Sequence, residues 1–410
     1  MKLCFLFTLL ISSNLYASYT NFNTILIGER AAGMGGASTA MVNDPAASSY
    51  YNPATLSRVE GSSLSAAVNL YSKFDTNYSD KSDLDDSILK VNRGSIVPIP
   101  SASGAVHSFG NFALGLSVLY PHFSNYSGQV KNNDDKTAYI NLRDESLWVG
   151  GSLAVNTSKQ ASVGFSFYYT SRTFSKSLTD RFSSGSVSTL ITQEKTFTQN
   201  SLIYILGYYN ELTPKLSLGL SYRFPSLQVD GEGSFNSSTV SSDGSTVEFK
   251  ENTQMSASSI TPAKVNLGLA YKSKKWTISA DLNHTERTVY NDVSESSLQE
   301  RYDYLPTFNL NLGVEYKFAN WLSCRAGAFT NLSATRNIPE NPNKKFADHI
   351  DMYGTSANCA VFTSHQSSVT LGGYYTGGSG HAVEQIANQL QKIEKNQRMF
   401  TFLVATSFKF

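Results

Sequence analysis

Apolar side chains recur at every second residue over most of this chain, in segments of about ten residues, the length of a membrane-crossing strand. The first such segment has Leu64, Ala66, Val68 and Leu70 on one face, and a later one has Phe112, Leu114, Leu116, Val118 and Tyr120. A period of two places these side chains on one face of a β-strand and the residues between them on the other. The chain therefore consists mainly of amphipathic strands.

The alternation predicts fourteen strands, at 64–70, 95–108, 112–120, 147–155, 163–169, 202–208, 216–224, 265–271, 276–282, 308–318, 322–328, 357–363, 368–375 and 402–410. Short turns such as Gly110-Asn111 alternate with long polar connections at 73–93, 122–143, 225–258 and 331–355. An even number of antiparallel strands with this asymmetry of turns is typical of a bacterial outer-membrane barrel. We therefore predict an all-β fold, a transmembrane antiparallel β-barrel over residues 59–410.

Composition favours the same class. Charged residues make up 16% of the chain, below the roughly 25% of soluble domains, while Tyr (23) and Phe (24) are numerous. No run of 18 apolar residues follows the N-terminal segment, which argues against an ordinary transmembrane helix. A secreted soluble β-protein is the alternative.

The N-terminus predicts export. Lys2 precedes the apolar run 3–11, and Ala17 is a small residue at a plausible cleavage point, so residues 1–17 read as a secretory signal peptide. The terminal Phe410 on an alternating strand is typical of substrates of the barrel-assembly machinery. We expect the outer membrane as the location and outer-membrane lipid as the surroundings.

Residues 18–58 lack the period of two. The glycines Gly33, Gly35 and Gly36 do not form a dinucleotide loop, because Ser38 occupies the last glycine position of G-x-G-x-x-G. Asp44-Pro45 and Asn52-Pro53 each combine a capping side chain with proline at the first helical position. The segment is therefore predicted to form short helical turns that fill the barrel as a plug.

The face opposite the apolar one should line the lumen. Five charged residues fall on it: Arg172, Arg223, Asp281, Glu315 and Arg325. We expect the last three to pair across neighbouring strands. Arg172 and Arg223 have no obvious carboxylate on an adjacent strand, which makes them candidates for holding an anionic head group.

Some inward positions are apolar, namely Tyr168, Ile203, Ile205, Phe329 and Leu403. Such side chains need an apolar partner, which is either the plug or a hydrophobic substrate.

Three local features leave alternatives open. Pro98 and Pro100 mark either a bulge or opening in the wall, because proline donates no ladder hydrogen bond, or a loop before the strand. Residues 381–399 have helical spacing of apolar side chains, which predicts a short amphipathic helix in the last outer loop. Cys324 and Cys359 either form a disulfide or stay free.

The stretch from Arg30 to Gly61, "RAAGMGGASTAMVNDPAASSYYNPATLSRVEG", resembles the N-terminal hatch of the FadL/TodX family of outer-membrane transporters. Asn52, Pro53 and Ala54 match the family's Asn-Pro-Ala step, and Asp44 matches the acidic position before it. The segment "VPIPSASGAVHSFGNFALGLSVLYP" is similar to the family's second and third strands. About 90 residues carry this resemblance.

The resemblance implies a fourteen-stranded barrel plugged by its N-terminus. It also implies transport of long-chain fatty acids or other apolar molecules, released sideways through a gap in the wall. Gly33, Gly35, Gly36, Asp44, Asn52, Pro53 and Ala54 would then form the plug or gate. A non-transporting barrel that serves as a scaffold or secretion accessory is the alternative.

We expect no catalysis, cofactor, metal or nucleic acid. None of the six histidines lies in a carboxylate–serine pattern that recurs at strand ends.

Overall fold

The structure is a computed structural model that describes residues 20–42, 44–59, 61–78, 91–92, 99–133, 136–296, 298–344, 346–364, 366–386 and 389–410. The predicted signal peptide, residues 1–17, and Pro98 lie outside these ranges. No helix in the described ranges is long and apolar enough to cross a membrane.

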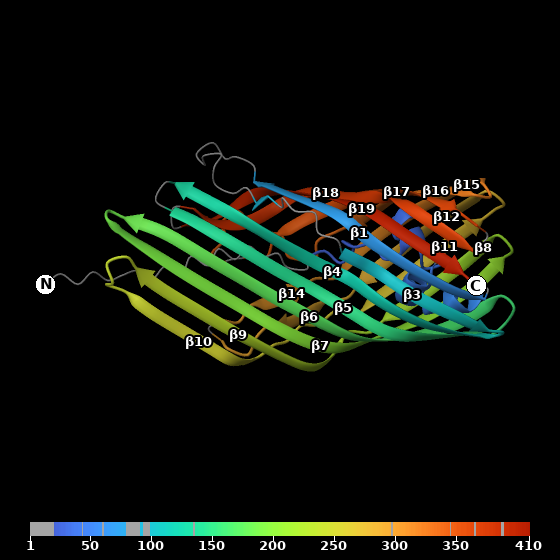
Figure 1. The fold of residues 1–410 in the computed structure, drawn as a ribbon, viewed down its shortest axis with the longest axis horizontal. Helices are drawn as coiled ribbons and strands as arrows, with labels where there is room; N and C mark the ends of the chain where they lie inside the picture. The colour runs from blue at the N-terminus through green and yellow to red at the C-terminus, as the bar shows by residue number, and fades with distance from the viewer. Residues whose placement is uncertain are drawn as a thin grey trace.

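Fourteen strands form a closed antiparallel wall (Figure 1). In order around it they are β1 (Ser62–Tyr78), β3 (Ile99–Phe109), β4 (Phe112–Asn133), β5 (Lys136–Asn156), β6 (Ala161–Ser184), β7 (Val187–Thr213), β8 (Leu216–Arg223), β11 (Lys264–Lys272), β12 (Trp276–Thr285), β15 (Thr307–Ala319), β16 (Leu322–Asn331), β17 (His349–Phe362), β18 (Ser367–Ile386) and β19 (Gln389–Lys409). Each strand pairs with the next, and β19 pairs with β1. The predicted barrel and its strand count are confirmed.

The remaining strands are β2 (Val91–Asn92), β9 (Leu227–Ser241), β10 (Val247–Ser256), β13 (Thr288–Asn291) and β14 (Arg301–Tyr304). The β9–β10 hairpin extends the wall, because β9 pairs with residues 189–202 of β7. In Figure 1 these extensions lie at the end opposite the C-terminus. The sequence underestimated strand length: β4 and β5 run through most of the polar connection expected at 122–143. Strands that project beyond the bilayer have water on both faces, so they need no apolar alternation.

The helix predicted at 381–399 is wrong. Residues 381–386 end β18, and 389–394 begin β19 and pair with them, Ala382 opposite Ile393. Both of these side chains are buried. The apolar residues that suggested one helix therefore belong to two paired strands, and their helical spacing is coincidental.

The two faces of the wall divide as expected. Leucines such as Leu114, Leu116, Leu267 and Leu310 are exposed on the outer face, the one that meets lipid. The inner face is rich in buried serine, threonine and asparagine.

The N-terminal segment lies inside the barrel, near the end that carries the short turns and the C-terminus (Figure 1, blue). It contains α1 (Glu29–Gly33), α2 (Pro45–Tyr51) and the 3-10 helix η1 (Pro53–Arg58). The Asp44 carboxylate accepts a hydrogen bond from the Ala47 N–H at 3.0 Å, and the Asn52 side chain accepts one from the Ala54 N–H at 3.2 Å. Both predicted helix starts are confirmed. We call residues 20–58 the hatch.

Candidate functional site

Asp281 on β12 anchors the hatch to the wall. One of its carboxylate oxygens accepts hydrogen bonds from the Ser38 N–H (2.7 Å), the Thr39 N–H (2.8 Å) and the Thr39 hydroxyl (2.7 Å). The expectation that Asp281 pairs with Glu315 and Arg325 is wrong. Its charge is satisfied by backbone donors of the hatch, a partner that strand register does not reveal.

Glu315 and Arg325 form a second anchor. The Arg325 guanidinium binds one Glu315 oxygen at 2.8 Å, as predicted, and the hatch residue Arg30 binds the other at 2.5 Å. Opposite Arg325 on β17, the Asn358 amide donates to the Glu29 carbonyl of the hatch at 2.7 Å. Arg325 and Asn358, on adjacent strands, thus connect this part of the wall to α1 of the hatch, Arg325 through Glu315 and Asn358 directly.

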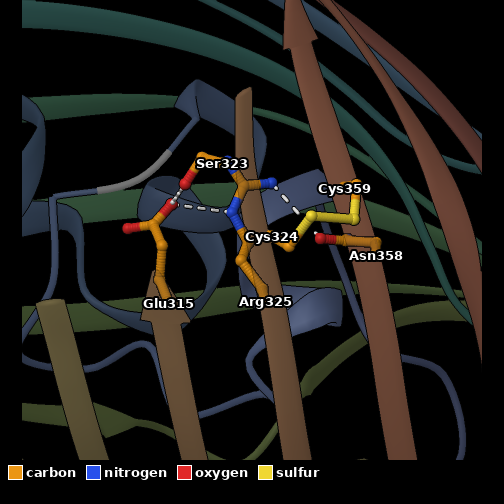
Figure 2. Close-up of a disulfide and its surroundings, with 6 residues drawn as sticks. All are labelled: Glu315, Ser323, Cys324, Arg325, Asn358 and Cys359. Atoms are coloured by element: carbon orange, nitrogen blue, oxygen red, sulfur yellow. Dashed lines mark hydrogen bonds and ion pairs between the residues drawn. A yellow bond between two sulfur atoms is a disulfide. The ribbon is translucent and has the colours of Figure 1, made fainter. Parts of the chain in front are cut away.

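Cys324 and Cys359 form a disulfide. They are cross-strand neighbours on β16 and β17, each next to a residue that contacts the hatch network, Arg325 and Asn358 (Figure 2). Side chains alternate along a strand, so the disulfide lies on the lipid side of the wall and the network on the lumen side. Of the two alternatives that the sequence left open, a disulfide or two free cysteines, the structure shows the disulfide.

Glycines of the wall let the hatch backbone approach closely. A Cβ at Gly164, Gly207, Gly219, Gly313 or Gly327 would overlap hatch atoms. The atoms concerned belong to Ala54, Asn52, Thr39, Met34 and Gly35, in that order. These glycines come from β6, β7, β8, β15 and β16, and we call them the glycine seat. A seat spread around the barrel holds the hatch against the wall on several sides.

The hatch glycines have matching roles. Gly35 and Gly36 adopt positive φ angles of 65° and 80°, which favour glycine. Gly33 ends α1 where a Cβ would overlap the Asn358 side chain.

The Asn-Pro-Ala step is fully enclosed. Asn52 donates to the carbonyls of Thr39 (2.8 Å) and Tyr208 (2.9 Å), and so links two parts of the hatch to β7. Pro53 begins η1, and Ala54 is buried. Asp44, besides capping α2, accepts a hydrogen bond from the Glu29 N–H at 3.2 Å.

The inward apolar residues contact the hatch. Tyr168, Ile203 and Ile205 pack in one buried cluster with hatch residues that include Ile25, Ile27 and Tyr51. Phe329 and Leu403 pack in another with Leu26 and Ala32. Of the two partners that the sequence allowed, the plug is the one these side chains meet.

A partly open pocket lies against the hatch, several of whose residues line it. It is lined by Asn21, Phe22, Thr24, Tyr50, Pro121, His122, Ser146, Trp148, Thr170, Arg172, Gln199, Ser201, Arg223, Ser259, Ile260, Thr261, Pro262, Tyr290 and Tyr304. None of the five inward apolar residues is in this lining. The lining combines aromatic rings with many polar side chains, two of them arginines.

Arg172 lines the pocket, but its guanidinium already forms an ion pair. Its guanidinium binds the Asp144 carboxylate of β5 through two hydrogen bonds, at 2.9 and 2.8 Å. The expectation that Arg172 lacks a strand-neighbour carboxylate is wrong. Asp144 lies two residues along β5 from Ser146, the direct partner of Arg172, and a long side chain reaches such a diagonal neighbour.

Arg223 differs from Arg172. It is only 7% exposed, and in the part of the chain that the structure describes no carboxylate forms an ion pair with it. Its Nη2 donates to the Pro262 carbonyl at 3.2 Å, its guanidinium lies 5.7 Å from the centre of the Trp148 ring, and Tyr50 is a further hydrogen-bond neighbour. Its Nε has no hydrogen-bond partner. The pocket thus holds a buried cation with an unused donor.

Among the described residues, the β3–β4 ladder ends beside the pocket. Pairing between β3 and β4 runs from Phe109–Phe112 to Ala102–Leu119. Beyond it, β4 shifts register against β5 between Leu119 and His122, which brackets Pro121. Pro100 lies in β3 next to a register shift against β1. Pro100 therefore belongs to the wall and not to a preceding loop, and the two prolines flank the last described pair of the β3–β4 ladder, Ala102–Leu119.

Sequence reasoning missed most of the pocket. Trp148 carried a signal, because a large aromatic side chain falls on the inward register between Leu147 and Val149. Tyr290 and Tyr304 carried none, since the short strands β13 and β14 have too few residues to show a period.

Solved structures with the same fold are known. The chain aligns with a FadL homologue of Pseudomonas aeruginosa at a TM-score of 0.72 and 16% identity, covering 95% of this chain and all of that one. It aligns with the toluene transporter TodX of Pseudomonas putida at 0.65 and 16%, covering 93% and 98%. For the toluene transporter TbuX of Ralstonia pickettii the values are 0.62, 15%, 94% and 98%. No curated protein matches the chain by sequence.

The sequence itself matches a family model. Residues 9–343 fit the model described as outer membrane protein transport protein (OMPP1/FadL/TodX). This range contains the hatch and the residues that line the pocket. It spans most of the chain, and the fold of the solved structures agrees with it. The chain is therefore a member of the OMPP1/FadL/TodX family of outer-membrane proteins that transport hydrophobic compounds.

Proposed function

We propose that this protein takes up hydrophobic molecules that bear an anionic group, of which long-chain fatty acids are the simplest, and releases them sideways into the outer membrane. The observation that carries the proposal is the pocket against the hatch. It joins an unpaired buried arginine and aromatic walls, and it lies beside the last described pair of the β3–β4 ladder.

Arg223 is the proposed partner of the anionic group. A buried guanidinium with an unused Nε donor binds a carboxylate through charge-assisted hydrogen bonds. Arg172 is already neutralised by Asp144, so its role is to hold Asp144 and shape the wall. The apolar part of the substrate would lie against Phe22, Trp148 and Tyr304.

Sideways release follows from the closed path below the pocket. The hatch is packed against the glycine seat and anchored by Asp281 and Glu315. A substrate would need to disrupt these contacts to continue straight through the barrel. The pocket wall at Pro121 and His122, in contrast, belongs to the part of β4 that follows its last described pair with β3.

Uptake by cells with and without the protein tests the proposal, with a labelled long-chain fatty acid and a neutral aromatic such as toluene as the two substrates. Arg223→Gln should lower the affinity for the fatty acid about tenfold or more, the value of one charge-assisted hydrogen bond, and leave toluene uptake unchanged. Arg223→Lys should restore part of it. Equal loss for both substrates would contradict the role of Arg223, and no uptake of either would favour a scaffold.

A cross-link between β3 and β4 tests the exit. In a variant with serine in place of Cys324 and Cys359, the pair Ser101→Cys and Tyr120→Cys would extend the β3–β4 ladder by one position. Oxidation should stop uptake, and a reducing agent should restore it. The pair Ser103→Cys and Val118→Cys, which joins positions already opposite each other, is the control. Uptake that continues in the oxidised first variant would exclude this exit.

We further propose that residues 1–17 are removed on export and that the barrel-assembly machinery inserts the mature chain.

A further inference from the structure

Five lysines gather at the short-turn end of the barrel. Lys215 lies in the β7–β8 turn, Lys274 and Lys275 in the β11–β12 turn, and Lys272 and Lys317 at the ends of β11 and β15. Backbone hydrogen bonds join these places: the Lys272 N–H donates to the Lys215 carbonyl at 2.7 Å, and the Lys317 N–H to the Lys275 carbonyl at 2.8 Å. We call these five residues the lysine rim.

The positive charge of the lysine rim is not neutralised by neighbouring carboxylates of the described residues. All five side chains are exposed, and none forms an ion pair with a carboxylate of the described residues. The whole chain has a net charge of only +1, so a rim this basic leaves the remainder of the molecule net negative. Clustered like charges repel one another, and an anionic partner relieves the repulsion.

An aromatic band lies directly beside the rim on the lipid face. Trp276 is 47% exposed and Phe318 is 59% exposed. The rings of Trp276 and Tyr316 are 4.3 Å apart, and those of Tyr316 and Phe318 are 4.7 Å apart. Farther from the turns, outward residues of β11, β12 and β15 are apolar and exposed: Leu269, Ile278 and Leu312. From the turn inward, the surface therefore passes from cationic to aromatic to aliphatic.

This order matches one phospholipid molecule. Acyl chains cover aliphatic side chains, tryptophan and tyrosine lie at the level of the glycerol and head group, and lysine meets the phosphate. Lys272 and Lys317 continue the lumen register of their strands, whereas Lys215, Lys274 and Lys275 lie in or next to turns, from which long stems reach the head-group level. Short barrel turns face the periplasm. The phosphate would thus belong to the inner leaflet of the outer membrane.

We propose that Lys215, Lys274 and Lys275 of the lysine rim and the adjoining aromatic band form a binding site for an anionic phospholipid of the inner leaflet, such as phosphatidylglycerol or cardiolipin. The site is separate from the transport pocket, since none of the residues that line that pocket belongs to the lysine rim or the aromatic band.

Tryptophan quenching by brominated lipids tests the site on the full-length mature protein in mixed micelles. The chain has three tryptophans. Trp148 is 3% exposed in the lumen, where acyl chains do not reach it, and Trp321→Phe leaves Trp276 as the lipid-facing reporter. Brominated phosphatidylglycerol should quench Trp276 with an apparent affinity at least about tenfold above that of brominated phosphatidylethanolamine, since each lysine near an anionic surface adds a severalfold gain. Raised salt should reduce this preference.

The variant Lys215→Gln, Lys274→Gln and Lys275→Gln should abolish the preference. A matched control removes three exposed lysines elsewhere, Lys159→Gln, Lys250→Gln and Lys409→Gln, and should retain it. Heat-dependent migration on a gel checks that both variants remain folded barrels. Equal quenching by the two lipids, or equal loss in the control, would overturn the proposal. So would displacement of the lipid by a soluble acidic protein at equal charge concentration, because the rim would then be a protein-binding surface.

Discussion

At the scale of single residues, two carboxylates on the lumen face of the wall hold the hatch in place by hydrogen bonds and ion pairs. Asp281 binds backbone donors of the hatch, and Glu315 binds one arginine from the wall and one from the hatch. A buried carboxylate that accepts several hydrogen bonds contributes strongly, because its removal leaves donors unpaired.

Asp281→Ala is expected to weaken the seating of the hatch by roughly 3 kcal/mol, since two buried backbone N–H groups and one hydroxyl lose their acceptor. The readout is ion conductance in planar bilayers, which should rise above that of the wild type. Asp230→Ala, which removes an exposed carboxylate from β9, is the control. A conductance equal to the control would show that Asp281 is dispensable for the hatch.

Glu29 in the hatch predicts a dependence on pH. Burial raises the pKa of its carboxyl above the ordinary glutamate value, against the opposing influence of Arg325 and of the Thr370 hydroxyl. A raised pKa means that the protonated form is favoured in the folded state, so its stabilisation is present at acid pH and is lost as pH rises through the raised pKa. Leak conductance should therefore rise as the pH is increased above the ordinary titration range of a glutamate, and Glu29→Gln should reduce this rise. A wild-type leak that does not change with this increase in pH would refute the idea.

At the scale of elements, different sequence signals predict the strands of the wall and the helices of the hatch. Membrane strands were predictable because lipid on one side imposes a period of two, and the capped helix starts at Asp44 and Asn52 were predictable because they are local. The strand extensions at 381–394 were misread, since water on both faces removes the period. Tyr290 and Tyr304 join the pocket, and Asp144 meets Arg172, only through long-range packing, for which a single sequence has no local signal.

The glycine seat gives a prediction at this scale. Gly164→Ala on β6 would drive a Cβ into the backbone of Pro53 and Ala54, and a backbone neighbour has little room to give way. We expect a displaced hatch, measured as faster protease cleavage within residues 20–58 and a higher leak conductance. Gly151→Ala on β5 is the matched control, because its Cβ would have no neighbour closer than 3.7 Å. Equal cleavage of the two variants would mean that the seat tolerates a methyl group.

At the scale of the whole molecule, the hatch and the wall have separate roles. The fourteen-stranded ladder is closed without the hatch, since every wall strand has a wall strand on each side. The hatch, in contrast, packs apolar side chains against those of the wall. The wall should therefore persist when the hatch is absent.

Deletion of residues 20–58 behind an intact signal peptide is expected to leave a folded barrel that conducts ions as an open pore. Planar-bilayer conductance measures the pore, and heat-dependent gel migration measures the barrel. Conductance as low as that of the full chain would show that other segments close the lumen. A chain that fails to fold would show that the hatch is needed as a template for the wall.

The pairing of β1 with β19 has a consequence for the order of events in biogenesis. The hatch is joined directly to β1, and Ser62 exchanges backbone hydrogen bonds with the terminal Phe410, so the first and last parts of the wall meet at a single seam. The hatch is synthesised before any strand, yet it can be enclosed only by a sheet whose final strand has arrived. Its contacts with β16 to β19 also span about 300 residues of chain, so they form late. Seam closure is therefore a commitment step: a hatch outside the cylinder when β19 reaches β1 would have no route back in except through the wall or the mouth.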